Sequence, residues 1–390
     1  MDPARNPYAP GAGKQPPLLT GRDGVLAEAA LKLRRLSGGF NTRDVLLLGL
    51  RGVGKTVLLN AVEDDADAGG HHVIIIEAPE GETLPSLLVP RLRRVITRFS
   101  RVEQARQHAR RAMEALGSFA KAFKVTYGDF ELGLDVEIPA ADSGNLELDL
   151  PELFIAVGRA AKSAGASVVI LIDEVQYLSR VDFAGLIVAL HRVSQKALPI
   201  LFIGSGLPQV AGLAGDAKSY AERLFEYVQV GPLDKEAAYA ALEGPAAQQG
   251  VRYGQEALGE IYRQTRGYPY FLQEWGRHAW NVAGGREIDV ADVAAATELA
   301  FARLDEGFFN VRFDRLTPKE QDYLHAMARL GSGPHKSGEI AERMDSSVQS
   351  VGSARRALIK KGMIYSPMHG QTAFTVPLFD EFMLRRMGRK

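Results

Sequence analysis

The sequence DVLLLGLRGVGKT at residues 44–56 specifies the fold of the first half of the chain. Residues 44–48 form a short apolar run with the length and composition of a buried parallel strand. Residues 49–56 fit the pattern G-x-x-x-x-G-K-[ST] in full, and a helical pattern follows them. In such a loop, glycines let consecutive backbone N–H groups point inward and hold phosphate oxygens, helped by the positive end of the next helix. The stretch therefore predicts a strand, a phosphate-binding loop and a helix.

This loop is expected to surround the phosphates of a bound nucleotide. The residues expected to bind it are Gly49, Gly52, Val53, Gly54, Lys55, Thr56 and Val57. The Lys55 ammonium is expected to reach the β- and γ-phosphates and to take part in catalysis, and the Thr56 hydroxyl is expected to ligate Mg²⁺. ATP and Mg²⁺ are therefore the expected cofactors, although the loop does not distinguish adenine from guanine.

A second motif, VVILIDE at residues 168–174, places two carboxylates at the C-terminal end of a buried strand. Ligands bind at that end of the strands in open α/β sheets. Asp173 is predicted to hold Mg²⁺ directly or through water, and Glu174 to polarise the water that attacks the γ-phosphorus. An acidic pair can also be a solvated strand end, but the phosphate loop upstream favours a catalytic pair.

Further apolar runs at residues 73–76 and 200–203 alternate with helical patterns. This alternation predicts an α/β fold, a P-loop parallel sheet with helices on both faces. Residues 80–150 interrupt it as an insertion, with an arginine-rich helix over residues 91–111 and an acidic strand over residues 130–138. Either these two segments pack on each other, or they contact another protomer or a nucleic acid.

The two motifs together resemble those of the P-loop ATPases of the additional-strand class. Three more segments narrow the resemblance to AAA+ and STAND proteins, similar to origin-recognition-like and archaeal-type ATPases. LTGR at residues 19–22 resembles their adenine-side segment, which implies that Arg22 lies near the nucleotide. ILFIGS at residues 200–205 is similar to the sensor-1 strand, which implies that Ser205 touches the γ-phosphate or the attacking water.

The third segment, TRGYPYFL at residues 265–272, resembles the G-x-P motif of STAND and archaeal-type lids, where the proline, here Pro269, lies near the nucleotide. Conventional AAA+ lids offer a sensor-2 arginine at about this point. Arg223 lies where this class often carries an arginine finger, which would act in catalysis within its own subunit or on a neighbour. The alternative for Arg223 is a surface salt bridge.

The chain is expected to fall into four parts. Residues 1–17, rich in proline and glycine, are expected to form a flexible tail, and residues 18–231 the P-loop core. Residues 232–310 are expected to form a helical lid. Residues 311–390 are expected to form a winged helix, because a helix, a short helix, a third helix and two strands follow one another there.

The C-terminal unit holds 14 Lys and Arg residues against 8 Asp and Glu residues. One face of its third helix is polar and basic, and the residues predicted to contact DNA there are Gln349, Ser353, Arg356 and Lys360. Such a face suits the DNA major groove. A protein–protein module or a merely solvated face remains the alternative.

The composition excludes several kinds of chemistry. The 390 residues include no cysteine, which rules out disulfides, cysteine-ligated zinc, iron–sulfur clusters and a thiol nucleophile. Lys plus Arg and Asp plus Glu both number 47, so net charge says nothing about partners. The N-terminus lacks the apolar segment of a signal peptide, and prolines interrupt the uncharged stretch at residues 197–215. We therefore expect a cytoplasmic protein without membrane contact.

Two functions fit these observations. The first is a Mg²⁺-dependent ATPase whose nucleotide state controls the lid and a winged helix that binds DNA or protein. The second is a slow, STAND-like nucleotide switch that acts through protein assembly, with copies of itself or another protein, and without DNA contact. The intact Glu174 favours turnover in both.

Overall fold

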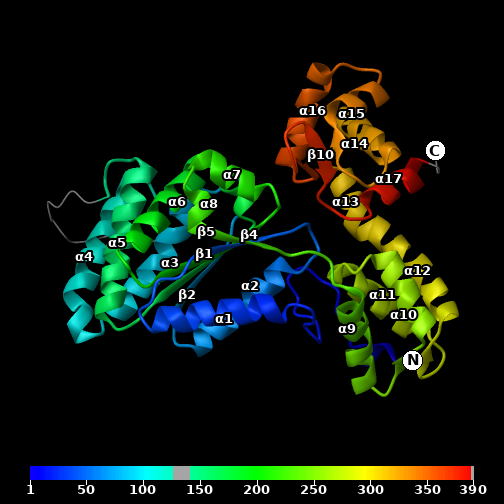
Figure 1. Ribbon diagram of the computed structural model, residues 1–390, viewed down its shortest axis with the longest axis horizontal. Helices are drawn as coiled ribbons and strands as arrows, with labels where there is room; N and C mark the ends of the chain where they lie inside the picture. Colours follow the sequence, from blue (N-terminus) through cyan, green and yellow to red (C-terminus); the bar gives the residue numbers. More distant parts are fainter. Residues whose placement is uncertain (126–140, 388–390) are drawn as a thin grey trace.

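The computed structural model describes residues 1–125 and 141–387. The acidic strand predicted over residues 130–138 lies outside the described residues. Figure 1 shows an α/β core at one end of the molecule and two helical units at the other, joined at the carboxyl edge of the sheet.

The core contains a parallel sheet whose strands, in the order β2-β3-β4-β1-β5, are β2 (His72–Glu77), β3 (Val168–Asp173), β4 (Ile200–Gly206), β1 (Asp44–Leu48) and β5 (Phe225–Gln229). Strand β4 pairs with both β1 and β3, so one strand separates the phosphate loop from the acidic strand end. This is the arrangement that the resemblance to the additional-strand class implies. Every residue of β1, β3 and β4 is buried, as a parallel sheet covered on both faces requires. The predicted fold class is confirmed.

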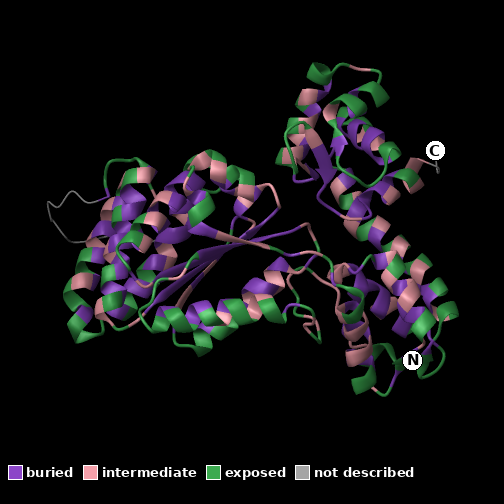
Figure 2. Cartoon of the chain, viewed as in Figure 1, coloured by how far each residue is buried: buried purple, intermediate pink, exposed green. Residues whose placement is uncertain are grey.

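Helices cover both faces of the sheet (Figure 2). One face packs on α1 (Asp23–Ser37) and α2 (Lys55–Ala68). The other face packs on a thicker layer, namely α3 (Leu84–Phe99), α4 (Arg106–Ala122), α5 (Leu146–Ser163), α6 (Arg180–Gln195), α7 (Val210–Ala217) and α8 (Ala221–Leu224). Apolar side chains on the inner sides of these helices form a hydrophobic core on each face of the sheet.

The prediction of one arginine-rich helix over residues 91–111 is wrong. The structure has two helices there, α3 and α4, separated at Ser100 and joined by a short turn at Glu103–Ala105. Both helices bury an apolar side, through residues such as Leu92 and Leu116, and α4 packs on α5. The arginines alone gave no sign of the break, because they occupy the exposed sides of both helices.

The lid follows the core as α9 (Lys235–Gln248), α10 (Gln255–Thr265), α11 (Pro269–Val282) and α12 (Val290–Leu304). A short parallel pair, β6 (Arg252–Tyr253) and β7 (Glu287–Ile288), was not expected from the sequence. Helix α12 continues through a π-helical turn, Asp305–Phe309, into α13 (Asn310–Phe313). The lid is thus joined to the C-terminal unit by helix rather than by a loop.

The C-terminal unit begins with α13 and continues with α14 (Pro318–Leu330), β8 (His335–Lys336), α15 (Ser337–Arg343), α16 (Val348–Lys360), β9 (Ile364–Tyr365), β10 (Gln371–Phe374) and α17 (Phe379–Met387). The expected order of helices and strands is present, and β8 adds a third strand in the order β8-β10-β9. The lid and this unit share one apolar core.

Residues 1–17, expected to be flexible, lie against the lid. The Tyr8 hydroxyl donates to the Leu242 carbonyl at 2.5 Å, and the Tyr8 ring fills the space beside Gly276. The Trp280 indole N–H donates to the Asp2 carbonyl at 2.9 Å. The prolines and glycines favour a flexible segment, whereas the buried Tyr8 fixes it in place. None of the helices that the structure describes has the length and apolarity needed to span a bilayer.

Candidate nucleotide-binding site

A cavity of about 430 Å³ lies between the phosphate loop, the lid and the N-terminal segment. The predicted binding residues that line it are Arg22, Gly52, Val53, Gly54, Lys55, Thr56, Val57 and Pro269, and Glu174 lines it as well. Gly49 lies outside the lining, at the start of the loop. A Cβ atom there would come within 2.2 Å of the Val230 carbonyl oxygen, so only glycine fits.

The loop takes the form that phosphate binding needs. Gly52 and Gly54 have φ values of 82° and 91°, in the left-handed region that favours glycine. Lys55 begins α2, and its ammonium donates to the Gly49 and Leu50 carbonyls at 2.9 and 3.0 Å. Burial lowers the Lys55 pKa, while Glu174 and Asp173 act in the opposite direction. A buried ammonium held only by carbonyl groups is well suited to meet an anion.

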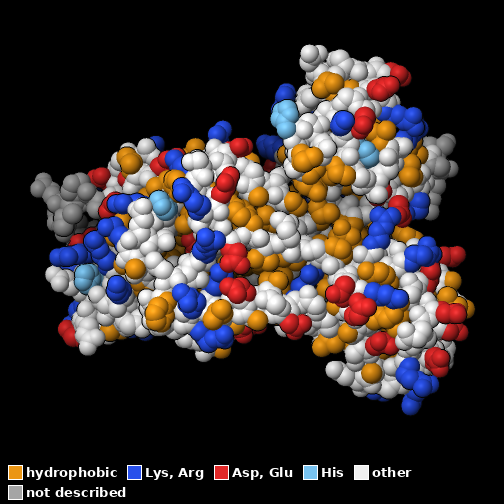
Figure 3. All heavy atoms as spheres, in the orientation of Figure 1, with side chains coloured by type: hydrophobic (Ala, Val, Ile, Leu, Met, Phe, Trp, Pro, Cys, Tyr) orange, Lys and Arg blue, Asp and Glu red, His pale blue; other side chains and the backbone are white. Residues whose placement is uncertain are grey.

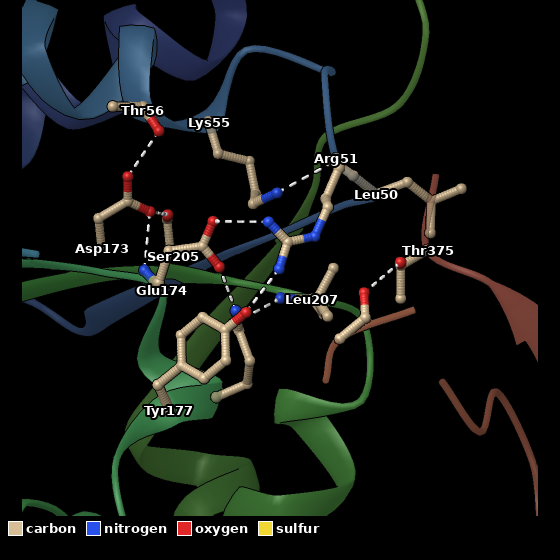
Figure 4. Close-up of polar contacts among 12 residues, drawn as sticks. Leu50, Arg51, Lys55, Thr56, Asp173, Glu174, Tyr177, Ser205, Leu207 and Thr375 are labelled. Atoms are coloured by element: carbon tan, nitrogen blue, oxygen red, sulfur yellow. Dashed lines mark hydrogen bonds and ion pairs between the residues drawn. The ribbon is translucent and has the colours of Figure 1, made fainter. Parts of the chain in front are cut away.

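Asp173 connects the loop to the neighbouring strands (Figure 4). Its Oδ2 accepts from the Thr56 hydroxyl at 2.5 Å, and its Oδ1 accepts from the Ser205 hydroxyl and, at 2.8 Å, from the Glu174 backbone N–H. Ser205 is fully buried at the tip of β4, beside β3. The structure thus brings together the residues predicted for the metal and for the sensor position.

Glu174 follows β3 in the left-handed conformation, with φ of 55°. One of its carboxylate oxygens accepts from the Gln176 amide, and the other lies 3.9 Å from the Arg51 guanidinium. The Arg51 guanidinium also donates to the Tyr177 hydroxyl at 2.6 Å. In this structure the carboxylate predicted to polarise water is therefore held by neighbouring side chains.

Two predicted residues join the loop to the lid. The Arg22 guanidinium donates to the Val53 carbonyl at 3.1 Å and to the Gly231 carbonyl at 2.5 Å, where the chain leaves the core. Burial lowers the Arg22 pKa, and Asp234 opposes this effect. Pro269 begins α11, and the backbone N–H of the next residue, Tyr270, donates to the Gly52 carbonyl at 3.2 Å.

Arg223 does not join the site of its own chain. It lies beside Asp44, at the N-terminal end of β1, whereas the phosphate loop follows the C-terminal end of that strand. The strand spans five residues, about 16 Å at roughly 3.3 Å per residue, and an arginine side chain cannot cover that distance. Only another copy of the chain could present its nucleotide to this residue.

The residues predicted to contact DNA are all exposed on α16, and none of them lines the cavity. The face opposite them, with Val351, Ala354 and Leu358, is buried. The predicted division of this helix into a core side and a polar side is therefore present.

Sequence reasoning missed two arginines and the N-terminal cover of the site. Arg51 occupies a position that the loop pattern leaves free, and Arg312 belongs to no motif, yet both line the cavity. Residues 9–14 line it too. The backbone N–H of Arg51 also donates to the Thr375 carbonyl of the C-terminal unit at 3.0 Å. No signal in the sequence indicates this contact, because the residues lie more than 300 positions apart in the chain.

Known families match both ends of the molecule. Residues 18–203 match the AAA ATPase domain, and residues 306–383 match a domain of unknown function, DUF8462. Residues 18–203 therefore form an AAA ATPase domain of the P-loop type, and the protein is an enzyme that hydrolyses ATP. The predicted resemblance to AAA+ ATPases and the predicted class of enzyme are confirmed. No curated protein matches the sequence significantly.

Solved structures resemble the chain over nearly its whole length. The Walker-type ATPase PABY2304 of Pyrococcus abyssi is 19% identical, over 94% of this chain and 96% of that one, with a TM-score of 0.58. This likeness shows a shared fold. Aeropyrum pernix Orc1 in complex with DNA is 18% identical over 95% and 94%, with a TM-score of 0.46. The Thermotoga maritima RuvB Holliday junction branch migration motor is 14% identical over 91% and 92%, with a TM-score of 0.44.

Proposed function

We propose that this ATPase is Mg²⁺-dependent and that its nucleotide state controls the position of the lid and of the C-terminal unit. One observation carries the proposal: two adjacent residues of the phosphate loop hydrogen-bond to these two parts of the chain. Gly52 accepts from Tyr270 of the lid, and Arg51 donates to Thr375 of the C-terminal unit. A change in the loop on nucleotide binding alters both contacts at once.

Thr56 and Asp173 are the residues that would hold Mg²⁺. Their oxygens lie 2.5 Å apart, and both are hard donors of the kind that Mg²⁺ prefers. The described residues contain no cluster of three or more His, Asp or Glu side chains placed for a metal. This fits an ion that takes its remaining ligands from phosphates and water. When bound, Mg²⁺ neutralises charge on the β- and γ-phosphate oxygens.

The residues of the site divide the rest of the work. Lys55 exchanges its two carbonyl partners for phosphate oxygens. Ser205 holds Asp173, so the metal-binding oxygen is oriented before the ligand arrives. Glu174 leaves Gln176 and Arg51 to orient and polarise the attacking water.

The exposed face of α16 supports duplex DNA as the partner of the C-terminal unit, which we propose acts as a winged helix. Arg356 and Lys360 lie on that face, and the unit as a whole carries six more basic than acidic residues. Such a helix suits the major groove.

ATP turnover by the purified protein, with and without duplex DNA, tests this proposal, with Glu174→Gln as the blank. We expect turnover above the blank that DNA stimulates and that removal of Mg²⁺ abolishes. Turnover that DNA leaves unchanged would contradict the DNA part.

A second candidate is a slow nucleotide switch acting through protein assembly. The engagement of Glu174 by Gln176 and Arg51 favours it, because the water-polarising carboxylate is occupied while the C-terminal unit contacts the loop. Oligomerisation that depends on the bound nucleotide, together with turnover indifferent to DNA, would select this candidate.

A further inference from the structure

The C-terminal unit contributes an arginine to the nucleotide cavity. Arg312 lies on α13 and lines the cavity together with Gly307 and Phe308 of the π-helical turn. Its guanidinium lies 4.0 Å from the centre of the Phe308 ring and donates to the Phe308 carbonyl at 2.6 Å. Phe308 in turn stacks on Tyr270 of the lid, with ring centres 5.1 Å apart. These contacts hold the guanidinium at the wall of the cavity.

The cavity has an excess of positive charge. Its basic lining residues are Lys14, Arg22, Arg51, Lys55 and Arg312, and its one acidic lining residue is Glu174. Arg51 lies 3.9 Å from Glu174, whereas Arg312 belongs to none of the ion pairs found among the described residues, and its guanidinium donates to a backbone carbonyl. Burial, and after it the charge of Arg51, lowers the pKa of Arg312 to about 10. Arg312 remains charged at neutral pH, so an anion placed beside it would be stabilised.

The lid offers no positive charge that could replace that of Arg312. The lid residues that line the cavity are Leu233, Ala241, Pro269, Tyr270, Leu272 and Gln273, and none of them is basic. The cations that the loop and the C-terminal unit contribute to the cavity are therefore Lys55, Arg51 and Arg312, and Arg51 lies 3.9 Å from Glu174.

We propose that Arg312 binds the terminal phosphate of a nucleoside triphosphate and so links its presence to the C-terminal unit. The inference rests on the proposed function, since Glu174 marks the side of the γ-phosphate only if it acts on the attacking water. Arg312 lines the same cavity as Arg51, and Arg51 lies 3.9 Å from Glu174, whereas the backbone N–H groups of the loop lie at the start of α2. On this proposal, a diphosphate held by the loop does not contact Arg312.

Arg312 cannot respond alone, because α13 is fastened to the rest of the C-terminal unit. Phe313 is buried in the shared core. The Arg386 guanidinium of α17 donates to the Asn310 side chain, and Arg385 pairs with Asp305 at 2.6 Å. On the face drawn in Figure 3, hydrophobic side chains gather where this unit meets the core and the lid. A pull on Arg312 would therefore move the unit against the loop.

Binding of Mg·ADP and of Mg·AMP-PNP, measured by calorimetry, tests the proposal. Arg312→Met keeps the length of the side chain and removes its charge. We expect it to weaken AMP-PNP binding about ten- to a hundred-fold, the range for a hydrogen bond to a charged group, and to leave ADP binding unchanged. Arg315→Ala removes an exposed arginine three positions away and is expected to change neither affinity.

Equal losses for both nucleotides, or no loss, would overturn the assignment of Arg312. If Arg312→Met has a lower melting temperature than the unaltered protein without nucleotide, Arg312→Lys takes its place in the binding test. The lysine keeps the positive charge but lacks the planar guanidinium, so we expect Arg312→Lys to lose affinity for AMP-PNP and not for ADP. A different result would show that the proposed function itself is wrong. In that case the unaltered protein would bind neither nucleotide, or Lys55→Ala would bind both normally.

A distance measurement tests the coupling separately. Since the chain has no cysteine, Asp64→Cys on α2 and Ser350→Cys on α16 can be spin-labelled selectively. We expect the label separation to differ between the ADP and AMP-PNP states and to stop differing when Arg312→Met is added. A difference that persists at saturating AMP-PNP would show that Arg312 does not transmit the nucleotide state.

Discussion

Asp173 is the side chain on which the site depends most. One of its oxygens meets Thr56 of the phosphate loop, and the other meets Ser205 of β4 and the backbone of Glu174. Three chain segments that are distant in sequence are thereby aligned by a single buried carboxylate. Both of its carboxylate oxygens accept hydrogen bonds, from two hydroxyls and one backbone N–H, so this buried side chain is held in one orientation.

At the residue scale, Glu174→Gln should separate binding from hydrolysis. The amide keeps the shape of the side chain but cannot polarise water, so turnover should fall by at least about a hundred-fold while ATP binding persists. Turnover assays and calorimetry measure the two effects. Glu152→Gln, at an exposed position on α5, is the matched control. Normal hydrolysis by Glu174→Gln would show that another group activates the water.

At the scale of elements, the parallel sheet determines which residues can meet. All strands run in one direction, so the loops after β1 and β3 and the tip of β4 come to one edge. The residues at the strand starts, Asp44 among them, lie at the opposite edge. Arg223 belongs to that second edge. Its expected role as a finger is possible only between copies of the chain.

We therefore expect the effect of Arg223→Ala on ATP turnover to depend on protein concentration. If Arg223 completes the site of a neighbour, turnover per chain should rise with protein concentration in the unaltered protein and stay flat in Arg223→Ala. At high dilution the two should be equal. ATPase assays over a dilution series measure this. A loss of turnover in Arg223→Ala that is the same at every concentration would contradict action between copies.

The start of β1 also carries a buried acid with a pH-dependent effect. Burial raises the pKa of Asp44 to about 7, although the Phe202 backbone N–H at 2.8 Å and the charge of Lys32 oppose the rise. Lys32 itself pairs with Glu226 at 2.7 Å. The usual value for Asp44 is 3.8. Between these two values the folded state holds a proton that the unfolded chain has released, so the Asp44 contribution to stability falls as pH rises.

Asp44→Asn cannot ionise and keeps an oxygen that can accept from Phe202. The free energy of unfolding of Asp44→Asn minus that of the unaltered protein should increase steadily from about pH 4 to about pH 7 and stay constant above pH 7. Urea unfolding across this range measures the difference. Asp322→Asn, an exposed position on α14, should show no such trend. A constant difference for Asp44→Asn would mean that Asp44 does not titrate in this range.

At the scale of the whole molecule, the lid and the C-terminal unit form one body. They share an apolar core and are joined by a continuous helical segment from α12 to α13. The N-terminal residues add to this body through Tyr8 and Asp2. In the proposed function, a nucleotide bound between the core and this body would move α16 together with the lid, without a separate hinge at residue 310.

The DNA proposal belongs to this scale and has a matched test. Arg356→Ala with Lys360→Ala should weaken duplex binding and reduce the salt slope by about one unit for each phosphate that is no longer neutralised. Lys319→Ala with Arg329→Ala removes the same charge from exposed positions on α14 and should change both much less. Titrations at several salt concentrations measure the effects. Equal changes in both double variants would indicate a general charge effect rather than a helix in the groove.

The strands, the phosphate loop and the acidic strand end could be predicted from the sequence alone. Strong local signals specify them: a run of apolar residues buried on both faces, and glycines whose φ values few other residues adopt. Lys55, Thr56 and Asp173 could be named for the same reason. The break between α3 and α4 could not be predicted, because tertiary packing on α5 decides it.

Tertiary packing was needed to bring Arg51, Arg312 and residues 9–14 to one cavity and Arg223 to the opposite edge of the sheet. No local pattern encodes these placements. They follow from the direction of the strands, from the burial of Tyr8 on the lid and from the helix that carries α12 into the C-terminal unit. Contacts between residues hundreds of positions apart depend on how whole elements pack, and a local sequence pattern describes only neighbours along the chain.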